Sequence, residues 1–135
     1  MQNMSQSPPD NPMLGNRYRL VHQVGKGGMA LVFEGYDTLL ERPVAVKLLK
    51  QDFSGNPEFR ERFKQEARAA ANLSHPNIVT VHDYGVDQFG VFIVMEYISG
   101  TDLKTKLREI DHFEAREGLS VVIQACLGLG YAHRA

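Results

Sequence analysis

Residues 24–47 read VGKGGMALVFEGYDTLLERPVAVK, and this stretch decides the fold of the chain. Three glycines stand in four positions, at Gly25, Gly27 and Gly28. Glycine takes positive φ without a steric penalty and lets the backbone approach a ligand closely. Exposed N–H groups in such a turn can bind phosphate oxygens. The stretch therefore predicts a phosphate-binding loop.

Two architectures place glycines at this spacing. With Ala30 as its last member, the run fits the dinucleotide pattern Gly-x-Gly-x-x-Gly/Ala, which requires a helix directly after the loop. Residues 31–36 are instead β-branched and aromatic, and residues 44–46 form a second short apolar run that ends on Lys47. Such segments, bounded by turn signals, favour a hairpin. We expect the glycines to join two antiparallel strands, with Lys47 on the next strand within reach of a phosphate. A dinucleotide-binding oxidoreductase is the disfavoured alternative.

A helix is predicted from Asn56, as its N-cap, to about Leu73, with Pro57 in the first turn. Its apolar stripe consists of Phe59, Phe63, Ala70 and Leu73. Glu66 interrupts that stripe, and a carboxylate facing a core is costly unless it is paired. Lys47 is the cation expected to pair with it. The alternative is a rotated stripe that leaves Glu66 in solvent.

The remaining pattern predicts an α+β fold. Further strands are expected at residues 17–24, 78–84 and 91–97, which gives a five-stranded antiparallel sheet with one docked helix. Two helices follow, one from Asp102 to about Leu107 with Thr101 as N-cap and one from Phe113 to about Tyr131. Residues 1–16, rich in Pro, Ser, Gln and Asn, are expected to be a disordered leader.

A strand, a glycine loop, a second strand and a strand-borne lysine form the arrangement of protein kinases. From about Tyr18 to Ala135 the sequence resembles the amino-terminal part of a bacterial, eukaryotic-like serine/threonine protein kinase. The form Gly-x-Gly-Gly-Met-Ala-x-Val at residues 25–32 resembles the bacterial branch, and Ala30 departs from the commonest pattern in a way that predicts a slightly stiffer loop. The resemblance implies a small, ATP-binding lobe with its hinge at 17–98 and the start of an incomplete large lobe at 99–135.

The resemblance also implies roles for individual residues, with ATP and Mg²⁺ as cofactors. Lys47 is expected to contact the α- and β-phosphates, and Glu66 to pair with Lys47 in the active conformation. The other residues expected to contact nucleotide are Val24, Gly25, Gly27, Gly28 and Met29 of the loop, Val32 and Ala45 over adenine, Met95, Glu96 and Ile98 at the pocket back and hinge, and Asp102 at the ribose. Sheet packing alone also explains Val32 and Ala45. An acid favoured at a helix N-terminus explains Asp102 equally well.

The family's catalytic loop, H-R-D-x-x-x-x-N, and its D-F-G metal ligand do not occur in the sequence. Residues 133–135 imitate the first motif, but Ala135 stands where Asp is needed, and the Tyr-Ala-His run at 131–133 resembles the end of the preceding helix. The chain is therefore expected to be cut before the catalytic loop and to transfer no phosphate by itself. The alternative to a kinase is a non-catalytic fragment that binds nucleotide or a partner.

Composition narrows the setting. The 135 residues are 43% hydrophobic with a formal net charge of −1, which favours neither nucleic acid nor an anionic membrane as partner. One cysteine, Cys126, fits a reducing cytoplasm, and the five histidines show no zinc spacing, so no metal ligand set is expected within the chain. No signal peptide is indicated. Residues 119–132 are too short and too rich in glycine to span a bilayer. We expect a protein substrate for the complete enzyme and self-association through the exposed last helix.

Overall fold

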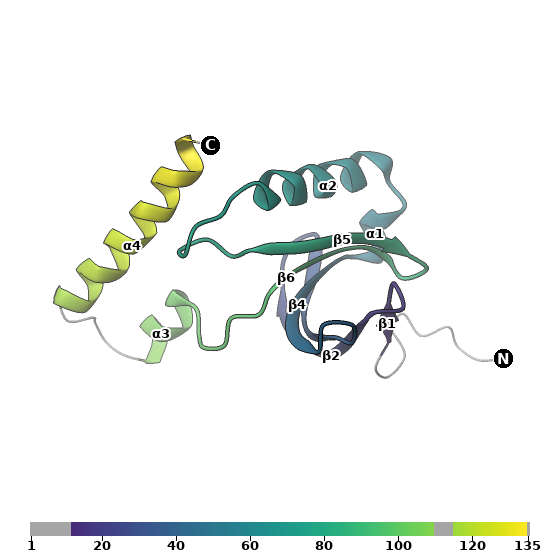
Figure 1. Ribbon diagram of the computed structural model, residues 1–135, viewed down its shortest axis with the longest axis horizontal. Helices are drawn as coiled ribbons and strands as arrows, with labels where there is room; N and C mark the ends of the chain where they lie inside the picture. Colours follow the sequence, from purple (N-terminus) through teal and green to yellow (C-terminus); the bar gives the residue numbers. More distant parts are fainter. Residues whose placement is uncertain (1–11, 110–114, 135) are drawn as a thin grey trace. The chain divides into compact units, whose positions relative to one another are not determined.

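The structure, a computed structural model, describes residues 12–109 and 115–134. The elements follow the chain in the order β1 (Met13–Leu14), β2 (Tyr18–Lys26), β3 (Ala30–Asp37), β4 (Arg42–Leu49), α1 (Gln51–Ser54), α2 (Pro57–Ala71), β5 (Val81–Asp87), β6 (Gly90–Glu96), α3 (Leu103–Glu109) and α4 (Ala115–Arg134) (Figure 1). They belong to two compact units. The first contains the described residues of 1–72 and 81–97, and the second contains 73–80 and the described residues of 98–135.

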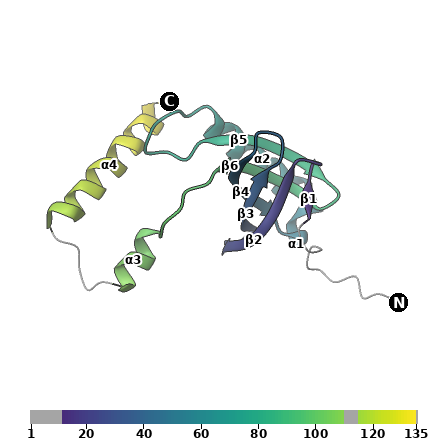
Figure 2. The same cartoon turned by 60° about the horizontal axis from the view of Figure 1, so that its bottom comes forward.

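The first unit is built on an antiparallel sheet of six strands in the order β1-β2-β3-β4-β6-β5 (Figure 2). Strands β2 and β3 form the predicted hairpin, with Gly25 opposite Val32 and Lys26 opposite Leu31. Residues 31–36 lie inside β3, so the hairpin is confirmed and the helix that a dinucleotide fold requires is absent from this stretch.

The two faces of this sheet carry different cores, because side chains alternate along each strand. On β4, Val44, Val46 and Leu48 enter one cluster, whose other buried members are Leu14, Tyr18, Leu20, Phe33, Phe92 and Val94. Leu49 enters the cluster on the other face, which also contains Ala30, Phe63, Ala67, Val91 and Ile93. The second cluster joins the sheet to helix α2.

Helix α2 begins as predicted. The Asn56 side-chain oxygen accepts a hydrogen bond from the Glu58 N–H at 2.9 Å, and Pro57 occupies the first helical position. The helix runs along β5 (Figure 1) and buries Phe63 and Ala67, one turn apart. Burial of Phe63, which is 2% exposed, contributes about 2–3 kcal/mol. The short helix α1 connects β4 to α2.

The amino-terminal edge of the sheet corrects one prediction. Residues 13–16 were assigned to a disordered leader, but Met13 and Leu14 form β1, and Leu14 is fully buried. Gly15 and Asn16 both take positive φ, and the Arg17 N–H donates to the Leu14 carbonyl across this turn at 3.0 Å. The turn lets one apolar residue reach the core. Residues 1–11 of the predicted leader lie outside the described residues.

The second unit consists of α3, α4 and residues 73–80. The Asn77 side-chain amide donates to the Gln124 carbonyl of α4 at 2.8 Å, and the Ser74 N–H donates to the Tyr131 hydroxyl at 3.2 Å. Gly128 is buried, and a Cβ there would lie 3.2 Å from the Asn77 carbonyl oxygen. Residues 77–78 therefore pack directly against Gly128.

The described part of α4 begins at Ala115, so the predicted start at Phe113 lies outside the described residues. Six apolar side chains of α4 are exposed: Leu119, Val121, Val122, Ile123, Leu127 and Leu129. Among the described residues, none of the helices combines the length and apolar character needed to cross a membrane.

Candidate nucleotide-binding site

The sheet brings four of the predicted site residues onto one face. Val32 pairs directly with Lys47, and Ala45 pairs directly with Met95. Ala45 and Lys47 are two residues apart on β4 and therefore point to the same side. Gly25, opposite Val32, brings the glycine loop to the edge of this face. A half-buried cation thus lies beside three apolar side chains under the loop that was expected to bind phosphate.

The glycine loop is compact. The Gly27 N–H donates to the Ala30 carbonyl at 2.8 Å, and the Lys50 N–H donates to the Met29 carbonyl at 2.8 Å. The sequence argument relied on the ability of glycine to take positive φ. In the structure Gly25, Gly27 and Gly28 are not among the residues with positive φ, so another property explains their presence. A Cβ on Gly28 would meet no atom within 4 Å, and the nearest atom to one on Gly27 would be 3.6 Å away. Their missing side chains leave open space over the backbone, which suits close approach by a ligand.

The predicted Lys47–Glu66 ion pair is not formed. Glu66 is exposed, and none of the ion pairs among the described residues joins it to Lys47. The Lys47 ammonium instead lies 6.0 Å from the centroid of the Phe63 ring. The reason is the rotation of α2. Its buried stripe is centred between Phe63 and Ala67, so Glu66 lies at the margin of the stripe, where water can solvate it. The structure therefore matches the alternative prediction, in which the apolar stripe of α2 is rotated and Glu66 lies in solvent.

The hinge residues belong to different units. Met95 and Glu96, in the first unit, are half-buried, and Met95 packs against the cluster that contains Phe63. Ile98, in the second unit, is exposed, and so is Val24 near the end of β2. The Asp102 carboxylate accepts the Thr105 N–H at 2.6 Å, and hydrogen bonding to Thr105 lowers the Asp102 pKa. Asp102, rather than Thr101, therefore caps α3, and its predicted ribose contact remains a prediction.

A charged network beside the sheet was not predicted. Arg17 donates to both carboxylate oxygens of Asp37, from Nε at 2.9 Å and from Nη2 at 2.8 Å. The same carboxylate accepts the N–H groups of Leu39 and Leu40. The bond from Arg17 holds the pKa of Asp37 well below its ordinary value although the carboxylate is 1% exposed. The only local sequence signal for this network is an acid, Asp37, followed by a turn. Its partner Arg17 lies twenty residues away, beyond the reach of local patterns.

Tyr18, beside Arg17, extends this network to β5. Its hydroxyl donates to the carboxylate of Asp83. Burial, followed by this hydrogen bond, raises the Tyr18 pKa above its ordinary value. These hydrogen bonds link the start of β2 to the end of β3 and to Asp83 within β5, and so stabilise the sheet that carries Lys47.

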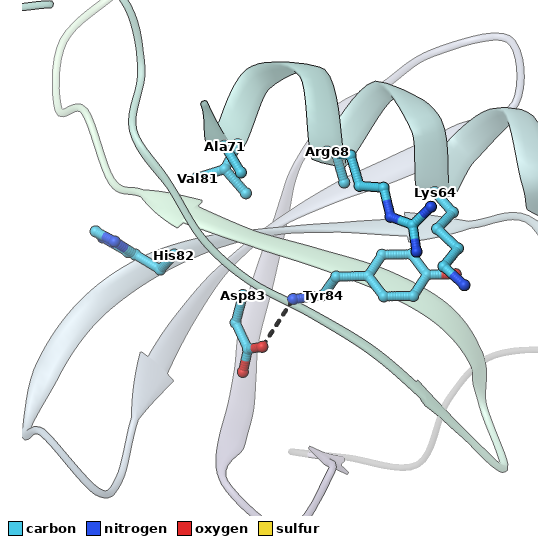
Figure 3. A pocket seen from close by; sticks show the side chains of 8 residues that line it. Lys64, Arg68, Ala71, Val81, His82, Asp83 and Tyr84 are labelled. Atoms are coloured by element: carbon cyan, nitrogen blue, oxygen red, sulfur yellow. Dashed lines mark hydrogen bonds between the residues drawn. The ribbon is translucent and has the colours of Figure 1, made fainter. Parts of the chain in front are cut away.

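A cavity of about 310 Å³ lies between α2 and β5 (Figure 3). Its lining residues are Lys64, Ala67, Arg68, Ala71, Val81, His82, Asp83 and Tyr84. Burial lowers the His82 pKa and raises the Tyr84 pKa. None of the predicted nucleotide contacts lines this cavity, although Val81 pairs with Met95 and therefore lies on the same face of the sheet as Lys47. No cluster of three or more metal-ligating side chains occurs within residues 12–109 and 115–134.

Comparisons with known proteins agree with this fold. A family model described as "Protein kinase domain" matches residues 18–135. The chain is 42% identical over 134 residues to the serine/threonine-protein kinase PknA of Mycobacterium tuberculosis, covering 96% of this chain and 31% of PknA. It is 36% identical over 121 residues to the serine/threonine-protein kinase PrkC of Bacillus subtilis, covering 90% of this chain and 19% of PrkC.

Among solved structures, the PknI kinase domain of Mycobacterium tuberculosis matches with a TM-score of 0.77 and 28% identity, over 95% of this chain and 52% of that chain. The class that fold and site define is a kinase small lobe followed by helices of a second lobe. The chain belongs to the protein kinase family. It spans between about a fifth and a third of the length of these two curated relatives.

Proposed function

We propose that this chain forms the ATP-binding part of a serine/threonine protein kinase, an enzyme that transfers the γ-phosphoryl group of ATP to protein hydroxyls. The observation that carries the proposal is the shared face of Val32, Ala45, Lys47 and Met95 under the glycine loop. Apolar side chains suit adenine, and a cation beside open backbone suits phosphates. The curated relatives, named as serine/threonine-protein kinases, support the same activity.

Each residue has a proposed task. Val32 and Ala45 cover adenine, Met95 closes the back of its pocket, and the main chain at Glu96 and Ile98 bonds its edge. Lys47 compensates charge on the α- and β-phosphates. Since Glu66 is exposed here, we propose that it pairs with Lys47 when nucleotide binds and α2 turns. Bound Mg²⁺ supplies further charge neutralisation.

The 135-residue chain by itself is proposed to bind nucleotide without transferring phosphate. Neither H-R-D-x-x-x-x-N nor D-F-G occurs in its sequence, and Lys47 alone leaves most of the phosphate charge uncompensated. The second candidate is a non-catalytic fragment that binds a partner, favoured by the six exposed apolar side chains of α4. We also propose that the chain self-associates through the exposed apolar side chains of α4. Its single cysteine, Cys126, supports a reducing, cytoplasmic setting.

Calorimetric titration with MgATP tests the nucleotide proposal. Saturable binding with one site per chain is expected, and Lys47→Met should weaken it at least tenfold. Ala45→Leu, which fills the adenine face, should abolish it. Lys64→Met, which lies on helix α2 and is not among the predicted nucleotide contacts, serves as the matched lysine control. Saturable binding of NADH with no binding of MgATP would contradict the proposal. Phosphorylated product from the purified chain would contradict its predicted inactivity.

A further inference from the structure

Two atoms of Lys50 donate hydrogen bonds to the tip of the glycine loop. Its ammonium donates to the Gly28 carbonyl at 3.2 Å, and its backbone N–H donates to the Met29 carbonyl at 2.8 Å. These are consecutive carbonyls, so a single residue fixes two neighbouring peptide groups of the loop. Lys47, the lysine with the predicted phosphate role, lies three residues earlier and approaches Phe63 instead.

The backbone of Lys50 is itself held in place. Lys50 follows β4 directly, and its carbonyl accepts the N–H groups of Phe53 and Ser54 at 2.9 and 3.0 Å in the first turn of α1. Its N–H donates to the Met29 carbonyl. Because both backbone polar groups of Lys50 are hydrogen-bonded, its backbone is already ordered. The side chain therefore loses less conformational entropy when it bonds the Gly28 carbonyl.

Fixing these carbonyls also orients the amide groups of the loop. All peptide bonds of the described chain are trans, and a trans peptide directs its N–H opposite to its C=O. The peptide that carries the Gly28 carbonyl ends in the Met29 N–H, and the peptide that carries the Met29 carbonyl ends in the Ala30 N–H. Each N–H group therefore points away from the Lys50 atom that bonds the carbonyl of its own peptide. Successive N–H groups in a turn can form a concave site that binds an anion, and the N–H groups of Met29 and Ala30 are the candidates here.

We propose that Lys50 is a positioning residue for nucleotide phosphate. It acts through the loop, by turning the N–H groups of Met29 and Ala30 toward the phosphates that Lys47 meets from the sheet. This inference rests on the proposed nucleotide function and adds a residue to which no phosphate role was assigned. Its distinctive consequence is selectivity, since loss of the tether should weaken binding of phosphate-bearing ligands and leave adenosine unchanged.

The experiment compares the wild-type chain with Lys50→Met, Lys50→Arg and the control Lys64→Met. MgATP, MgADP and adenosine are titrated calorimetrically, and amide hydrogen exchange at Met29 and Ala30 is followed by NMR without nucleotide. Loss of one charge-assisted hydrogen bond predicts MgATP and MgADP binding about threefold to tenfold weaker in Lys50→Met. Adenosine affinity should not change, and loop exchange should become faster. Lys50→Arg should restore both properties, and Lys64→Met should match the wild type.

The outcomes separate this inference from the proposed function. If Lys50→Met binds MgATP as tightly as the wild type, the proposed role of Lys50 is wrong, but the proposed nucleotide site is unaffected. Equal weakening for MgATP and adenosine also overturns it, because the residue would then serve stability alone. Weakened MgATP binding with unchanged loop exchange overturns the tether, since the charge would then act directly on phosphate. A wild-type chain that binds no MgATP removes the proposed function and this role together.

Discussion

A double-mutant cycle on Lys47 and Glu66 tests whether nucleotide creates their ion pair. The four proteins are the wild type, Lys47→Met, Glu66→Gln and the double variant. Glu66 is exposed and unpaired with Lys47 in the structure. Even formed pairs at such exposed positions contribute only about 0.2–1 kcal/mol. The coupling energy between the two residues in the free energy of unfolding should therefore stay below about 0.5 kcal/mol without nucleotide.

With MgATP the same cycle is read from dissociation constants. If α2 turns and Glu66 reaches Lys47, the coupling should rise to about 1 kcal/mol or more, which is about fivefold in Kd. Urea unfolding supplies the first coupling energy, and calorimetric titration supplies the second. Glu61→Gln, another exposed acid of α2, is the matched control and should show no coupling to Lys47 in either state.

Two results would refute this reasoning. A coupling above 1 kcal/mol without nucleotide would mean that the pair already exists in solution and that α2 is turned differently from the structure. Equal, negligible coupling in both states would mean that Glu66 takes no part in nucleotide binding.

Three further predictions concern packing and charge. Phe63→Ala should lower the free energy of unfolding by about 3–5 kcal/mol in urea titrations, and a loss below 1 kcal/mol would contradict the assigned core. Gly128→Val should destabilise by about 1–3 kcal/mol, whereas Gly130→Ala, which meets only a flexible arginine end, should stabilise by up to about 1 kcal/mol. Arg17→Met should destabilise more than Asp37→Asn, since it leaves a buried carboxylate without its cation. The folded-state pKa of Asp37 is lowered, so this contribution is fully present above the unfolded value near 4 and is lost progressively as pH falls from there through the lowered folded-state pKa. The loss caused by Arg17→Met should shrink between pH 7 and pH 3, and a constant loss would contradict the pairing.

Local sequence signals predicted the elements that depend on near neighbours. The hairpin follows from apolar runs on both sides of a glycine turn, and the start of α2 follows from Asn56 and Pro57. The position of Lys47 on the strand after the glycine loop follows from the second apolar run, which ends on it. These features are fixed within about fifteen residues of chain, where periodicity and turn chemistry decide the outcome.

The failed predictions depend on distant contacts. The rotation of α2, and with it the exposure of Glu66, is set by the packing of Phe63 and Ala67 on β5 and β6, which no helical pattern specifies. Strand β1 exists because Leu14 finds a core made of residues from four other strands. The role of Asp37 likewise required the position of Arg17 on a neighbouring segment. Tertiary packing overrides local preference in each case.

Methyl and amide NMR during titration with MgATP tests the nucleotide face most directly. We expect saturable shifts at Val32, Ala45, Met95 and the glycine loop, with Leu14 in the core on the opposite face of the sheet unmoved. Shifts confined to that opposite core, or no shifts at saturating MgATP, would contradict this expectation.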